Sequence, residues 1–213
     1  MKLADSRLHG EGCELFLVEG DSAARSVAML RDGATQAVLP LQGKPLNAWK
    51  ATRGKVLQSP LHRQLAYALG MHDAVTLGAA DLASLRYGRL MLLFDPDADG
   101  IHIGALVLLY LHRFAQPLID AGRVHMLRAP MYALTHPALD APLHAYSREH
   151  AQALLGTLSV PDADSAQLHA YRGLGSIPPQ VLQALCVDPR TRHSRVVGGE
   201  DIAAVKQAFG IAG

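Results

Sequence analysis

Carboxylates that follow two apolar segments are the residues of this sequence with the clearest chemical potential. Asp95, Asp97 and Asp99 alternate directly after the apolar run 90–94, and Glu19 directly follows the apolar run 15–18. Four clustered carboxylates repel one another strongly unless a cation neutralises them. Hard oxygen ligands on a short loop suit Mg²⁺, which keeps several waters and bridges to phosphate oxygens. Such a cation could stabilise charge on the leaving or attacking oxygen of a phosphodiester, and Glu19 could act as a ligand or as a general acid/base toward a sugar oxygen.

Two other interpretations of the aspartate loop stay open. The spacing of the three aspartates and Gly100 also begins an EF-hand calcium loop, but the twelfth loop position is Leu106, where that loop needs a glutamate. The segment before Asp95 is also typical of a strand and not of a helix. The second interpretation is a solvated acidic turn, since Asp99 near a helix N-terminus is favourable for dipole reasons alone. The separate acidic segment at Glu19 favours the metal site over both.

The elements that must position these acids follow an α/β pattern. Each acidic segment is predicted to lie between a strand and a helix, and the carboxyl ends of parallel strands gather ligands at one edge of a sheet. We expect strands at 15–18, 36–39 (stopped by Pro40), 90–94 and 123–127. We expect helices from near Ser22 and at 61–70, 102–115, 147–155, 179–185 and, from a weak pattern, 202–209. The predicted division is a core over 1–134, a variable insertion over 135–170 and a C-terminal part over 171–213.

Composition excludes several classes of protein. The 213 residues are 49% hydrophobic and 18% charged, which permits a sizeable core and is not typical of a disordered chain. A formal net charge of +1 excludes a strongly basic nucleic-acid module, although not a local basic patch. Two distant cysteines, Cys13 and Cys186, exclude a disulfide scaffold. The longest apolar run, 105–111, is too short to span a bilayer, and no signal peptide is visible, so we expect a cytoplasmic protein with no membrane partner.

Four ordered motifs together resemble the TOPRIM region of type IIA DNA topoisomerase B subunits. The first motif is Glu19-Gly20-Asp21-Ser22-Ala23, and the second runs from Leu39 to Asn47 around Gly43-Lys44. The third joins the three aspartates to Gly100, His102 and Ile103, and the fourth is Tyr171-x-Gly173-Leu174-Gly175. Their order and spacing match over nearly the whole chain. Two further segments, Leu85-Arg86-Tyr87-Gly88 and Leu46-Asn47-Ala48-Trp49, look closer to the topoisomerase IV B subunit than to that of gyrase.

The resemblance implies a Rossmann-like TOPRIM fold, an α/β fold with a parallel sheet flanked by helices, here with a C-terminal extension. It implies binding of one or two Mg²⁺ ions, and cooperation with the catalytic tyrosine of a separate A subunit. That tyrosine makes a transient double-strand break in DNA through which another duplex passes. By position, Glu19, Asp95, Asp97 and Asp99 match the metal-site acids, and Glu19 matches the general acid/base for religation. The residues expected at the DNA are Asp21, Arg25, Lys44, His102 and Arg172.

The sequence departs from the family pattern at several positions. Ala24 and Arg25 replace two glycines that usually follow the first motif, and Arg25 in a first helical turn opposes the helix dipole yet could grip a DNA phosphate. Gln42 replaces the usual basic residue before Gly43-Lys44. After the fourth motif, Ser176-Ile177 stands where the family has Glu-Met. These changes bear on DNA gripping and cleavage geometry, and they leave the four acids intact.

Three functions remain open. The resemblance favours the Mg²⁺-binding part of a topoisomerase that works with an A subunit, and in that case this chain alone is an incomplete enzyme. A full B subunit carries an ATP-binding domain and a transducer domain before this region, and we expect the chain to lack an ATPase domain and an ATP site. None of the six tyrosines occupies a position expected of a nucleophile. The alternatives are a truncated relative that binds DNA or a topoisomerase subunit and regulates it without cleaving, and a nuclease that acts alone.

Two further features have a structural and a functional interpretation. Arg190, Arg192, His193 and Arg195 form a basic cluster, which is typical of a solvated face but also suits phosphate contact beside the fourth motif. Trp49 is interpreted as a packing anchor and not as a platform for base stacking.

Overall fold

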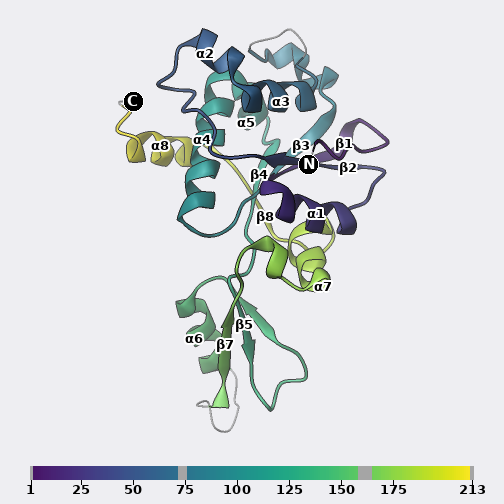
Figure 1. Cartoon of the computed structure of the whole chain (residues 1–213), viewed down its shortest axis with the longest axis vertical. Coiled ribbons are helices and arrows are strands. Elements are labelled where there is room, and N and C mark those ends of the chain that lie inside the picture. Colours follow the sequence, from purple (N-terminus) through teal and green to yellow (C-terminus); the bar gives the residue numbers. More distant parts are fainter. Residues whose placement is uncertain (1, 72–75, 158–164, 212–213) are drawn as a thin grey trace.

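A five-stranded sheet forms the centre of the molecule, as seen in a computed structural model that describes residues 2–71, 76–157 and 165–211 (Figure 1). Its strands are β1 (Gly10–Glu19), β2 (Gln36–Leu41), β3 (Tyr87–Leu93), β4 (Val124–Leu127) and β8 (Ser194–Val196), in the order β2-β1-β3-β4-β8. The first four run parallel, and β8 pairs antiparallel with β4 at the edge. The predicted α/β class with a parallel sheet is confirmed.

Helices cover both faces of this sheet, which explains why β1, β2 and β3 contain apolar stretches without alternation. Leu15 and Leu17 of β1 pack into one buried cluster, and Phe16 and Val18 pack into the other. The first face is covered by α3 (Pro60–Leu69) and α4 (Ala98–Phe114), with the shorter α2 (Arg53–Gln58) and α5 (Gln116–Asp120) and with α8 (Gly199–Ala208) nearby. The second face is covered by α1 (Gly20–Leu30), α7 (Pro179–Leu182) and the π-helical turn Gln183–Val187.

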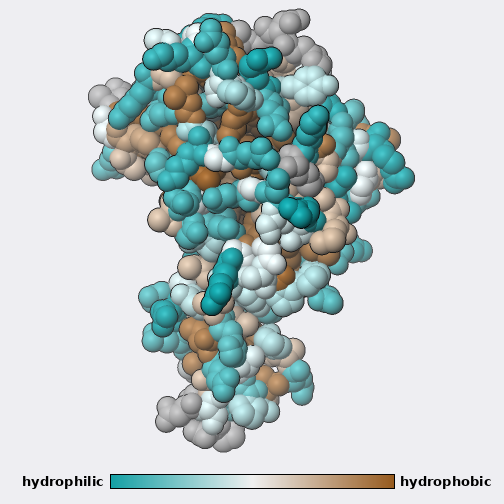
Figure 2. All heavy atoms as spheres, in the orientation of Figure 1, coloured by the Kyte–Doolittle hydropathy of each residue, from teal (hydrophilic) through white to brown (hydrophobic). Residues whose placement is uncertain are grey.

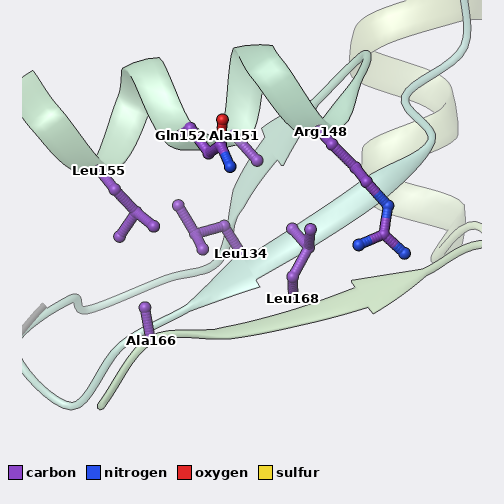
Figure 3. Close-up of a pocket in the computed structure, with 7 residues that line it drawn as sticks. All are labelled: Leu134, Arg148, Ala151, Gln152, Leu155, Ala166 and Leu168. Carbon is purple, nitrogen blue, oxygen red and sulfur yellow. The ribbon is translucent and has the colours of Figure 1, made fainter. Parts of the chain in front are cut away.

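A second, three-stranded antiparallel sheet extends away from this core in Figure 1. It consists of β5 (Tyr132–Thr135), β6 (Leu143–Ala145) and β7 (Gln167–Ala170), and α6 (Arg148–Thr157) packs beside it. Leu134, Ala151, Leu155 and Leu168 line a small hollow between α6 and the sheet (Figure 3). The helix predicted at 147–155 is confirmed. The strands β5, β6 and β7 were all missed, because strands of three or four residues leave little periodicity. The division at 134 and 170 stays a prediction.

Several predicted boundaries are wrong for identifiable reasons. Strand β2 continues through Pro40. Val38 donates its N–H to Ala4, on the side of β2 that faces away from β1. The nitrogen of Pro40, two residues on, faces the same side, so its lack of an N–H breaks no hydrogen bond to β1. Helix α4 begins at Ala98 because the Asp97 side chain caps it. Helix α8 begins at Gly199 because the Asp201 carboxylate accepts the N–H of Gly198 at 2.9 Å. The predicted end of α3 at Gly70 is confirmed, with φ of 86°.

The C-terminal segment is fastened to the core at two places. Lys206 of α8 lies 5.1 Å above the Trp49 ring, and His112 of α4 stacks on that ring at 5.5 Å, so Trp49 is a packing anchor as predicted. At the other place, Arg192 forms a buried ion pair with Glu14, and Gln36 also donates to Glu14 at 2.9 Å.

The surface in Figure 2 is mainly hydrophilic, with small apolar areas between polar ones. Within the described residues, no helix combines the length and the apolarity that a membrane crossing requires.

His62 is a buried titratable group on α3. Its side chain stacks on Tyr110 with ring centroids 4.7 Å apart, and neither ring nitrogen has a hydrogen-bond partner among the described residues. Burial lowers the pKa of His62 to about 4. The unfolded chain, with an ordinary histidine pKa of about 6.5, therefore takes up a proton first as the pH falls.

We predict that the free energy of unfolding falls by about 2–3 kcal/mol between pH 6.5 and pH 4 through this residue alone. The variant His62→Leu should lose that part of the acid sensitivity, as measured by urea denaturation at a series of pH values. His169→Leu, which changes an exposed histidine, is the matched control and should keep the wild-type slope. An unchanged slope in His62→Leu would contradict the assignment.

Candidate metal centre and DNA-binding surface

The ends of β1 and β3 bring the acids of two distant segments to one edge of the sheet. The two strands are neighbours and parallel, with Val18 paired to Leu93, so Glu19 and Asp95 leave the sheet side by side. Glu19 is also the N-cap residue directly before α1, and Asp97 is the N-cap residue directly before α4. Acids are favourable at these two positions because the positive end of each helix dipole attracts negative charge there.

Asp95 is held in place by the backbone of the fourth motif. Its Oδ1 accepts the N–H of Leu174 at 2.8 Å, across 79 positions of sequence. A Cβ added to Gly173 would lie 2.7 Å from Asp95 Oδ2, and one added to Gly100 would lie 2.0 Å from the Asp95 carbonyl oxygen. Gly173 also has a φ of 91°, which side chains rarely tolerate. Glycine is therefore required at both positions for the close approach that fixes Asp95.

The other acids have different environments. The Asp97 side chain accepts the N–H of Gly100 at 2.9 Å, which is the capping geometry that one alternative interpretation of the loop expected. Asp99 is exposed and forms an ion pair with Lys44, with Nζ and Oδ1 2.7 Å apart. Glu19 Oε2 is buried, and the described residues offer it no hydrogen-bond partner. A buried oxygen without a donor is the kind of atom that a bound cation or water satisfies.

The charges of the four acids act on one another. Burial raises the pKa of Glu19, and the charges of Asp95, Asp97 and Asp99 raise it further, while Lys44 opposes them. Burial also raises the pKa of Asp95 against the hydrogen bond from Leu174, with a further increase from Asp97. The hydrogen bond and charge of Lys44 lower the pKa of Asp99. The acids are therefore close enough to raise the pKa values of Glu19 and Asp95 through their charges.

The side chains do not surround a common point. Within the described residues, no group of three or more His, Cys, Asp or Glu side chains is gathered tightly enough to hold a metal ion as it stands. The Asp97 side chain instead accepts the N–H of Gly100 at the start of α4, and the Asp99 side chain pairs with Lys44. The donor set still fits Mg²⁺, because it consists of hard carboxylate oxygens at one edge, one of them buried without a donor. The predicted metal ligands therefore remain a prediction.

The residues expected at the DNA lie around these acids. Asp21 accepts a hydrogen bond from the Gln42 amide at 3.2 Å, and Arg25 donates to the Asp21 carbonyl oxygen at 3.4 Å. His102 is exposed, lies near Phe209 at 5.7 Å between ring centroids, and helps to lower the pKa of Asp99 after the larger effect of Lys44. Arg172 is exposed and directly precedes Gly173, and its backbone N–H donates to the Ser176 hydroxyl.

Sequence reasoning missed the role of Ser176. Its hydroxyl accepts the N–H of Arg172 at 2.7 Å and donates to the carbonyl oxygen of Gly173 at 2.8 Å. The residue that departs from the family pattern therefore fastens the turn that holds Asp95. A serine three residues after a glycine in a turn is a weak signal, but it is the one that could have indicated this contact.

The three arginines of the predicted basic cluster are paired with carboxylates of the same chain. Arg192 is buried against Glu14, Arg190 pairs with Asp188 at 2.7 Å, and Arg195 pairs with Asp201 at 2.7 Å. These three arginines stabilise the C-terminal segment through carboxylates of the same chain. The interpretation of the cluster as a phosphate contact is therefore wrong for Arg192 and is not supported for the other two.

A family model described as the Toprim domain matches residues 14–129, the part that contains β1 to β4 and the acids. The chain belongs to the Toprim domain family. It is 38% identical to the B subunit of DNA topoisomerase 4 from Pseudomonas aeruginosa over 183 residues, which cover 84% of this chain and 28% of that protein. It is 37% identical to the B subunit of DNA gyrase from Staphylococcus aureus over 209 residues, which cover 98% of this chain and 31% of that protein.

These comparisons confirm the predicted resemblance to the Toprim region of type IIA topoisomerase B subunits. The chain spans less than a third of the length of either relative. The Rossmann-like arrangement of the sheet and its helices agrees with the Toprim match.

We predict that Gly173→Ala lowers the free energy of unfolding by about 1–3 kcal/mol, because it forces a side chain into a left-handed backbone and against Asp95. Gly12→Ala in β1 is the control, since a Cβ there meets no atom within 4 Å. Urea denaturation of both variants measures the difference. Equal effects of the two substitutions would contradict the tight approach of Gly173 to Asp95.

Proposed function

We propose that this chain supplies the Mg²⁺-binding part of a type IIA topoisomerase, which supports cleavage and religation of DNA by the tyrosine of a separate A subunit. The observation that carries the proposal is the convergence of Glu19, Asp95, Asp97 and Asp99 at one edge of a Toprim sheet. The relatives named above are B subunits of enzymes that act on DNA. The proposal places the chain in the cytoplasm and assigns ATP binding to another part of the assembly.

Glu19, Asp95 and Asp97 would hold the ion, and Asp99 would join them once released from Lys44. When bound, Mg²⁺ supplies positive charge that stabilises negative charge on a phosphodiester oxygen. Glu19 is suited to hold or accept a proton at a sugar oxygen, because burial and the neighbouring acids raise its pKa toward the pH at which it works. Asp95 fixes the distance between the acids, because Leu174 and the two glycines leave it little freedom.

The cations around the acids would position the DNA backbone. Lys44, Arg25 and Arg172 are exposed and lie beside the acids or beside Asp21. Contacts of this kind fix the register of a duplex without reading its sequence. Arg25 adds a positive charge in the second turn of α1, where it donates to the Asp21 carbonyl oxygen, and Gln42 on the other side of Asp21 is neutral.

The test is a cleavage assay with supercoiled plasmid, Mg²⁺ and the A subunit of a type IIA topoisomerase from the same source. We predict linear and nicked products with the wild-type chain, none in EDTA, and at least about a hundredfold less with Glu19→Gln or Asp97→Asn, since proton transfer and charge stabilisation are both lost. Asp120→Asn, which changes an exposed acid at the end of α5, is the control and should cleave normally.

The alternative functions give distinct results in the same assay. Binding of DNA or A subunit without cleavage, together with inhibition of an intact topoisomerase, would favour a regulatory relative and contradict the proposal. Nicking by the chain without A subunit would favour a nuclease that acts alone.

A further inference from the structure

The Lys44–Asp99 ion pair joins a residue expected to bind DNA phosphate to a residue expected to bind metal. Lys44 belongs to the loop after β2, and Asp99 belongs to the first turn of α4. Their charged atoms are 2.7 Å apart, and 49% and 64% of the two side chains are exposed. Each partner is therefore occupied by the other in the absence of ligands, and both are open to solvent.

This ion pair is weak enough for each partner to exchange the other for a bound ligand. Exposed pairs of this kind gain little free energy, because water and salt screen the charges. A DNA phosphate offers Lys44 a charged oxygen acceptor like the carboxylate, and a divalent cation offers Asp99 a stronger positive partner than one ammonium group. Neither ligand needs to move the backbone to break the pair.

Lys44 also acts as the internal counter-charge of the acids. Its ammonium nitrogen lies 2.7 Å from the carboxylate of Asp99, which follows Asp95 and Asp97 in the same acidic segment. When Lys44 turns to a phosphate, the acids lose their nearest compensating charge, and their attraction for a divalent cation increases. When a cation neutralises the acids, Asp99 no longer holds Lys44, and Lys44 becomes available to phosphate.

We propose that the Lys44–Asp99 pair couples the two ligands, so that Mg²⁺ and DNA phosphate each strengthen the binding of the other by exchanging partners with this pair. The inference rests on the proposed function, because it takes the acids as the Mg²⁺ site and Lys44 as a phosphate contact. Coupling of this kind is reciprocal: the factor by which Mg²⁺ raises the affinity for DNA equals the factor by which DNA raises the affinity for Mg²⁺.

The experiment measures binding and not cleavage. Affinity of the full chain for a short fluorescein-labelled duplex is determined by fluorescence anisotropy in EDTA and in Mg²⁺ at matched ionic strength, without A subunit. We expect Mg²⁺ to raise the affinity of the wild type about threefold, a size typical of the exchange of one exposed ion pair. Non-specific screening by Mg²⁺ would lower the affinity, so the sign alone is informative.

Four variants separate the exchange from simple charge removal. Asp99→Asn should bind DNA about threefold more tightly than wild type in EDTA, because Lys44 is released, and should gain nothing further from Mg²⁺. Lys44→Gln should bind weakly in both conditions. In the double variant, Asp99→Asn should have no effect on the Lys44→Gln background. Asp120→Asn, which removes the charge of an exposed acid at the end of α5, should keep the wild-type response to Mg²⁺.

Two results would overturn the coupling. Asp99→Asn could strengthen DNA binding equally with and without Lys44, which would mean that only the lost negative charge matters. Alternatively, Asp99→Asn could leave the response to Mg²⁺ intact. Failure of the proposed function has a different signature, because a wild-type chain that binds neither the duplex nor Mg²⁺, measured by calorimetry, removes the proposed function and the coupling together.

Discussion

Repulsion between carboxylates is the constraint on which the structure of this site depends. Glu19, Asp95, Asp97 and Asp99 lie at one edge of the sheet, and Lys44 is the cation paired with them. The fold resists their separation by attaching each acid to a rigid element. Glu19 and Asp97 occupy the starts of helices, and the Leu174 N–H holds Asp95. The fold thereby holds several negative charges close together, and a divalent cation bound there would reduce their repulsion.

The positions that depart from the family pattern are accommodated by local contacts. Ala24 is fully buried in the core between α1 and the sheet, so its methyl group contributes packing instead of obstructing a ligand. Gln42 binds Asp21, and Ser176 fastens the turn around Gly173. Arg25 was expected in the first turn of its helix, but α1 begins at Gly20, so Arg25 lies in the second turn, where its charge faces solvent. The acid edge is thus preserved while the charges around it are redistributed.

The four parallel strands and the placing of acids at their ends were predictable from sequence, because buried parallel strands leave continuous apolar runs and the residues that follow them lie at one edge. Pro40 misled the prediction of β2, because only the register shows that its nitrogen faces outward. The contacts of Leu174, Ser176 and Lys44 were not predictable, since each joins segments that are distant in sequence or depends on side-chain direction. The contact of Arg192 was not predictable either, because a run of basic residues does not indicate that one of them pairs with the buried Glu14.

The most direct measurement of the central claim is an anomalous difference map from crystals of this chain soaked in Mn²⁺, an ion that shares the oxygen preference of Mg²⁺. The account predicts a peak bounded by the carboxylates of Glu19, Asp95 and Asp97, with the Glu19 oxygen that now has no donor directed toward it. A map with peaks elsewhere on the molecule and none at this edge would contradict the account.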